Sequence, residues 1–121
     1  MAAYNWVRFS ATCPVCKQAA DIRAQTHMVS SFDGPGNIRC RDRTYAIGDQ
    51  MRWWPDDQNR SWVSIHAVPK AGSAGVYEEC CYSNCQNCDA ALFAVIQFKD
   101  RSPIAVSALG RESEWPVRYP G

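Results

Sequence analysis

Two Cys-x-x-Cys pairs constrain this chain more than any other feature of its sequence. The first motif, CPVC, contains Cys13 and Cys16, and the second, CQNC, contains Cys85 and Cys88. Between the two motifs lie 68 residues, 17 to 84. Two intervening residues let the chain turn so that both sulfurs converge on one point, about 2.3 Å from a zinc ion. Two such turns, or knuckles, would together form a tetrahedral site of four thiolates. The fold must therefore bring two turns that are distant in sequence into contact.

Alternation of apolar and polar residues predicts a mostly β protein. Between residues 20 and 28, Ala20, Ile22, Ala24, Thr26 and Met28 alternate with polar side chains, which is typical of a half-buried strand. No window of 11 or more residues sustains the period of about 3.6 residues that marks a helix. The Gly- and Pro-rich turn at 33–37 predicts a hairpin return. The expected strands are residues 4–9, 20–28, 38–47, 50–54, 62–68, 91–99 and 104–108.

The length of 121 residues favours one domain, residues 1–121. We expect an antiparallel sheet that carries two zinc knuckles and inserted hairpins. Each knuckle precedes a predicted strand, so two knuckle-strand units can lie side by side. From about residue 110, where Pro116 and Pro120 follow, the C-terminal tail should be extended.

The two cysteine motifs and the strands after them resemble those of zinc-ribbon and rubredoxin-like proteins. The resemblance covers about a third of the chain. It implies a structural zinc ion bound by Cys13, Cys16, Cys85 and Cys88. Lys17 and Asp89 stand where that class often has glycine, immediately after the second cysteine of each knuckle.

Other assignments of the seven cysteines remain open. CPVC could be a redox dithiol, although that motif normally begins a helix and none is expected here. Four thiolates also suit iron. Cys80 or Cys81 could replace a cysteine of the second pair, but Cys85 and Cys88 repeat the spacing of the first. The more ordinary role for Cys40, Cys80 and Cys81 is that of small buried apolar residues.

The sequence argues against an enzyme. Four thiolates complete the coordination of zinc and leave no position for a reacting water. His27 and His66, the two histidines, lie on predicted strands and outside any known metal or nucleophile motif. Gly48-Asp49 is better interpreted as a β-turn than as part of a phosphate-binding loop.

A nucleic-acid interface is the alternative function. Arg39, Arg41 and Arg43 occupy alternate positions, so a strand would present all three guanidinium groups on one face. Tryptophans nearby could add stacking surfaces. The formal net charge of only +1 lacks the electrostatic signature of a phosphate binder, and a solvated strand face is the simpler interpretation.

Binding of a protein partner is the function that we favour from the sequence. The chain contains 5 Trp and 5 Tyr, which is more aromatic surface than so small a core must hold, and Trp, Tyr and Arg are the residues that dominate interfaces. A toxin-neutralising immunity protein or an adaptor would fit this description. The candidate partner-binding residues are Arg52, Trp53, Trp54, Tyr82 and Trp115.

The N-terminus, MAAYNWVR, lacks the charged and apolar regions of a signal peptide. The longest apolar stretch, residues 90–98, is far shorter than the roughly 20 residues that cross a bilayer. We therefore expect a cytoplasmic protein without a membrane partner. In the cytoplasm thiols stay reduced and can bind metal.

Overall fold

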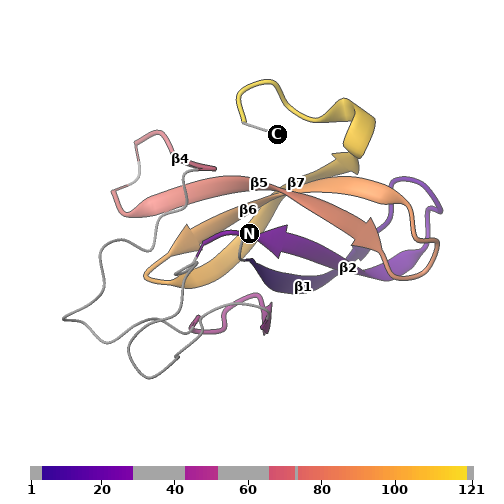
Figure 1. Cartoon of the computed structure of the whole chain (residues 1–121), viewed down its shortest axis with the longest axis horizontal. Helices are drawn as coiled ribbons and strands as arrows, with labels where there is room; N and C mark the ends of the chain where they lie inside the picture. The colour runs from indigo at the N-terminus through magenta and orange to yellow at the C-terminus, as the bar shows by residue number, and fades with distance from the viewer. Residues whose placement is uncertain (1–3, 29–42, 52–65, 73, 120–121) are drawn as a thin grey trace.

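The computed structural model describes residues 4–28, 43–51, 66–72 and 74–119. These residues form seven β-strands, one short 3-10 helix and no α-helix (Figure 1), so the predicted mostly-β class is confirmed. In the described part of the chain, no helix has the length and apolar character needed to span a membrane. The elements are β1 (Asn5–Thr12), β2 (Ala19–Thr26), β3 (Thr44–Ala46), β4 (Ala67–Pro69), β5 (Val76–Cys85), β6 (Ala91–Lys99), β7 (Ser102–Arg111) and η3 (Glu112–Glu114).

The strands form one curled sheet in the order β3-β1-β2-β5-β6-β7. The sheet is mixed rather than wholly antiparallel, because β3 pairs with β1 in parallel. β5 is paired on both of its edges. β6 pairs with nine residues along one edge, and β2 and β4 pair with different parts of the other edge. We expected the strands that follow the two cysteine turns, β2 and β6, to lie side by side. They do not, because β5 lies between them.

The alternation in β2 and the apolar character of β6 have the predicted consequences. Ile22, Ala24 and Thr26 are fully buried, and β6 has the predicted bounds, Ala91–Lys99. β6 is buried on both faces. Its inner face joins the main core, and its outer face is covered by the C-terminal segment, where Tyr119 packs with Phe93 and Val95.

Three parts of the fold differ from the sequence-based expectation. β5 was not predicted, because consecutive acidic residues and cysteines interrupt its alternation. β7 is longer than the predicted strand at 104–108. After η3 the chain turns back rather than extending, because the backbone N–H of Tyr119 donates to the carbonyl of Pro116 and the indole N–H of Trp115 donates to the carbonyl of Tyr119. Of the strands predicted at 38–47, 50–54 and 62–68, residues 38–42, 52–54 and 62–65 lie outside the described residues. β3 lies within the first of these ranges and β4 begins in the third, whereas residues 50 and 51 are not part of a strand.

Candidate metal centre

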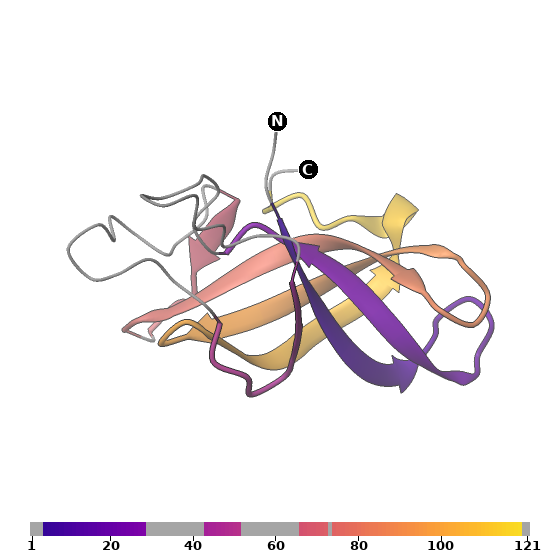
Figure 2. The same cartoon turned by 60° about the horizontal axis from the view of Figure 1, so that its bottom comes forward.

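The two Cys-x-x-Cys turns lie side by side at one end of the sheet (Figures 1 and 2). The first connects β1 to β2 and the second connects β5 to β6. They meet because β2 pairs with the end of β5, where Ile22 is opposite Cys85. The N–H of Gln86 also donates to the carbonyl of Asp21 at 2.9 Å, which fixes the second turn against β2.

The first turn directs backbone N–H groups at the sulfur of Cys13. The amides of Val15 and Cys16 lie 3.3 and 3.4 Å from Sγ of Cys13. The N–H of Lys17 donates to the carbonyl of Cys13 at 2.9 Å, which closes the turn. Lys17 adopts a φ of 63°, a conformation that glycine accepts most readily, so the turn keeps its geometry without the usual glycine.

The second turn repeats this geometry around Cys85. The amides of Asn87 and Cys88 lie 3.3 and 3.5 Å from Sγ of Cys85, and the N–H of Asp89 donates to the carbonyl of Cys85 at 2.8 Å. Asp89 has a φ of 61°. The side-chain amide of Asn87 also reaches Sγ of Cys16 at 3.5 Å, so one turn donates to the other turn's sulfur.

The sulfurs of Cys13, Cys16, Cys85 and Cys88 all lie within 4.8 Å of one another. Sγ of Cys13 is 3.8 Å from Sγ of Cys88, and Sγ of Cys16 is 4.0 Å from Sγ of Cys85. A tetrahedron with metal–sulfur bonds of about 2.3 Å has edges of about 3.8 Å. All four thiols are free, and these separations are about twice the length of a disulfide bond. The cluster could therefore bind one metal ion.

Burial divides the cluster into an inner and an outer half. Cys13 and Cys85 are fully buried and pack with Ile22 and Leu92 in a small core of their own. Cys16 is half-buried and Cys88 is exposed. The inner sulfurs are also the ones that receive two backbone N–H groups each, so the structure offsets the loss of water around them.

Hydrogen bonding changes the acidity of these thiols. The side chain of Asn87 is the largest of the influences that lower the pKa of Cys16 to about 6. Burial raises the pKa of Cys13, but the amides of Cys16 and Val15 outweigh it and the net shift is downward. At Cys88 the amide of Ala90 favours the thiolate, yet lost hydration and the neighbouring sulfurs raise the pKa to about 11.

Cys80 and Cys81 do not belong to this cluster. They lie further back on β5, opposite Val95 and Ala94 of β6. Burial and the nearby Glu79 raise the pKa of Cys80 to about 12 and raise the pKa of Cys81 well above its usual value. Both are buried among apolar side chains, as free cysteines usually are. Cys40 lies outside the described residues.

The other predicted functional residues are only partly described. Tyr82 is 45% exposed, and its ring lies 4.6 Å from that of Trp115. Arg43 is exposed immediately before β3, and its backbone N–H donates to the side chain of Asn5. The remaining residues of the two predicted interfaces lie outside the described residues: Arg39, Arg41, Arg52, Trp53 and Trp54.

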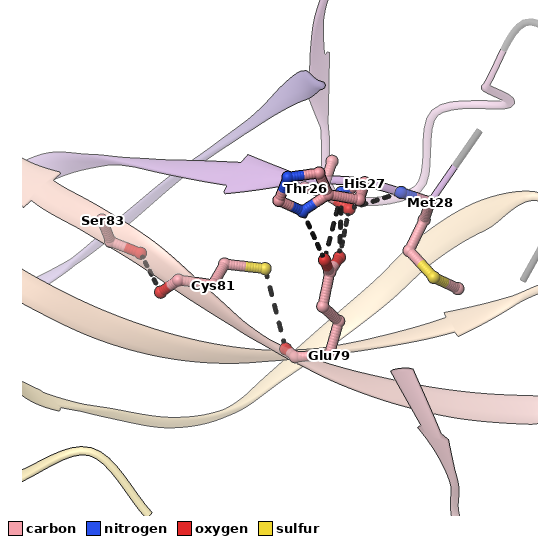
Figure 3. Close-up of polar contacts among 6 residues, drawn as sticks. All are labelled: Thr26, His27, Met28, Glu79, Cys81 and Ser83. Carbon is pink, nitrogen blue, oxygen red and sulfur yellow. Dashed lines mark hydrogen bonds and ion pairs between the residues drawn. The ribbon is translucent and has the colours of Figure 1, made fainter. Parts of the chain in front are cut away.

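Sequence reasoning missed a buried polar cluster around Glu79 (Figure 3). This side chain is 1% exposed. Its carboxyl group accepts a 2.5 Å hydrogen bond from the hydroxyl of Thr26 and one of 3.1 Å from the backbone N–H of His27, whose Nδ1 lies 3.2 Å away. The ring of His66 contacts that of His27, with 4.6 Å between centroids. The only sequence signal for this cluster was an acidic residue next to two cysteines.

Comparisons with known proteins do not assign the chain to a family. No family model, no curated protein and no solved structure matched it. Function must therefore be inferred from the geometry of the molecule itself.

Proposed function

We propose that this chain is a non-enzymatic protein-binding module in which Cys13, Cys16, Cys85 and Cys88 hold one structural zinc ion. The observation that carries the metal assignment is the convergence of four sulfurs within 4.8 Å of one another, with two of the separations, 3.8 and 4.0 Å, close to the edge of a zinc–thiolate tetrahedron. In this view each Cys-x-x-Cys turn acts as a zinc knuckle, as the zinc-ribbon resemblance implies.

A structural role fits these ligands better than a catalytic one. Four thiolates leave zinc without an open position for substrate or water. The backbone amides that point at Cys13 and Cys85 stabilise the negative charge that four thiolates bring to the ion. An ion here would cross-link the β1–β2 hairpin to the β5–β6 hairpin. Such a site suits a compartment that keeps thiols reduced, such as the cytoplasm.

Metal analysis of the purified protein tests this proposal. We expect one zinc ion per chain, and cobalt substituted for it should give the absorption spectrum of four-thiolate coordination. Cys16→Ser should weaken or abolish binding, whereas Cys80→Ala, outside the cluster, should keep one ion per chain. Iron in place of zinc would change the assigned metal. An equal metal content in Cys16→Ser and the unsubstituted protein would refute the ligand set.

The partner-binding part of the proposal rests on Tyr82 and Trp115. Tyr82 is one of four large apolar side chains that stand exposed in the described part of the chain, and its ring lies against Trp115. Arg118 is exposed in the C-terminal segment that also carries Trp115, and Tyr119 fixes this segment to the sheet through a 2.9 Å hydrogen bond to Glu78. Aromatic and arginine side chains of this kind form the centres of protein interfaces. An adaptor or an immunity protein would use such a surface.

Affinity capture with the zinc-loaded protein tests this surface. We expect Tyr82→Ser to lose a specifically captured protein, because the substitution removes an exposed aromatic ring without opening the core. Ile104→Ser is the matched control, since Ile104 is exposed to nearly the same extent, 42% against 45%, and lies on β7. Capture that is equal for the two variants would show that Tyr82 does not contribute to binding.

A further inference from the structure

The two ends of the curled sheet face each other across a gap. Four successive antiparallel pairings lead from β1 to β7, so these two strands run in the same direction. The chain itself fills the gap at the start of both strands (Figure 2, magenta). β3 pairs there with residues 6–8 of β1. Immediately afterwards, the N–H groups of Gly48 and Met51 donate to the carbonyls of Pro103 and Arg101, at 2.7 and 2.8 Å.

The gap remains open further along both strands, where it forms a cavity of about 390 Å³ that we call the edge slot. Its lining includes three consecutive residues of β1 and four consecutive residues of β7. Consecutive side chains of a strand point to opposite faces, so a lining of consecutive residues means that the strand edges themselves face the cavity. None of the lining residues is charged. They are Phe9, Ser10, Ala11, Ile47, Val106, Ser107, Ala108 and Leu109.

The edge slot also leaves the main core incompletely covered. Phe9, Ile47, Val106 and Leu109 are only partly buried, yet all four pack against the main core cluster. A group that enters the slot would therefore contact the apolar interior as well as the two strand edges. Backbone groups along the walls and apolar side chains at the base are the two features that strand addition uses.

We propose that the edge slot binds a short extended segment of a partner protein, which adds as a strand between β1 and β7. This inference rests on the protein-binding part of the proposed function and names the kind of partner segment. The open edges offer three residues of β1 and four of β7, or roughly 10–13 Å of extended chain. The segment carries apolar or small side chains and no charge at its centre, because a charge there would lose its hydration among uncharged neighbours.

The filled half of the gap indicates a polypeptide backbone, rather than a small apolar molecule, as the occupant. In that half β3 is extended and pairs with β1. A β-turn follows, in which the N–H of Asp49 donates to the carbonyl of Ala46, and the N–H groups of Gly48 and Met51 then donate to the carbonyls of Pro103 and Arg101 at the start of β7. The open half continues the same two strands. A hydrocarbon or aromatic ligand would fill the apolar base but would not satisfy backbone groups on either wall.

Selection from a displayed library of random heptapeptides against the zinc-loaded protein tests the proposal. We expect selected peptides with alternating apolar residues and no central charge. Ala108→Lys should weaken the best synthetic peptide about tenfold or more, because it places a charge in the slot. Ala108→Ser should bind normally. N-methylation of the peptide backbone should also abolish binding, and hydrogen exchange should slow at residues 9–11 and 106–109 when the peptide is bound.

Several outcomes would overturn the proposal. The proposal is wrong if the library yields no binder, or if Ala108→Lys binds the selected peptide as tightly as the unsubstituted protein. It is also wrong if the protein self-associates and Ala108→Lys abolishes that association, which would assign the slot to a second copy of the chain. Tyr82→Ser separates this test from that of the proposed function, since Tyr82 does not line the slot. If peptide binding is lost in Tyr82→Ser but kept in Ala108→Lys, the peptide binds at the Tyr82 surface. That result would support the proposed function and contradict binding in the edge slot.

Discussion

Removal of the metal is expected to abolish the cooperative unfolding transition of this protein or to lower its midpoint sharply. Zinc binding to finger peptides contributes an apparent free energy of roughly 10–16 kcal/mol. The whole stability of a domain of this size is about 5–15 kcal/mol. Two of the four sulfurs, those of Cys13 and Cys85, are fully buried, so without an ion the thiols would be crowded together in the core. Thermal unfolding with and without a chelator, under reducing conditions, measures the effect.

The loss should begin at the β1–β2 hairpin. β2 pairs with β5 through only three residues, Ile22, Arg23 and Ala24, whereas β6 pairs with β5 through nine. Hydrogen exchange of the metal-free protein should therefore speed up most in β1 and β2. Restoration of the original midpoint by added zinc is the control for irreversible damage. A metal-free protein that melts within a few degrees of the zinc form would contradict a structural role for the ion.

The sequence predicted the four-cysteine cluster because its geometry is local within each half. Two residues between cysteines are enough to fix each turn, and the alternation of β2 and the apolar run of β6 identified strands next to the turns. What the sequence did not contain was the partner of each strand. The register that places Ile22 opposite Cys85 depends on contacts across more than 60 residues, and no local pattern encodes it.

β5 shows why the remaining prediction failed. Alternation of apolar and polar residues identifies a strand only when one face of that strand is exposed to solvent. β5 is covered on both faces, by the main core and by the C-terminal segment. Glu78 and Glu79 therefore occupy buried positions that sequence rules would assign to solvent. Each is accommodated by hydrogen-bond donors from elsewhere: Glu78 by Tyr119 and Gln97, and Glu79 by Thr26 and His27. Such partners become visible only in the folded chain.

The four-cysteine cluster and the edge slot share β1. Phe9, Ser10 and Ala11 line the slot, and Cys13 follows two residues after them. An ion on Cys13 would hold this end of β1 against β2 and β5, and so keep one wall of the slot in place before a partner arrives. Preorganisation of this kind lowers the entropy lost on binding. A structural ion can thus support binding without contacting the partner.

Glu79→Ala is expected to destabilise the zinc-loaded protein by about 3 kcal/mol or more. The substitution leaves the hydroxyl of Thr26 and the backbone N–H of His27 without their acceptor in a site from which water is excluded. It also opens a cavity beneath β2, because the side chain is 1% exposed. Denaturant unfolding at constant zinc concentration measures the change, with exposed Glu112→Ala as the control, expected to change stability by about 0.5 kcal/mol or less.

A double-substitution cycle then identifies the cause of the loss. Thr26→Val removes the 2.5 Å hydrogen bond but keeps the shape of the side chain. If the hydrogen bond carries the effect, Thr26→Val should cost much less in the Glu79→Ala background than in the unsubstituted protein, because its acceptor is already gone. Strict additivity would attribute the loss to the cavity and to the unpaired N–H of His27 instead. A Glu79→Ala protein as stable as Glu112→Ala would show that the buried carboxyl group is not part of what holds β2 to β5.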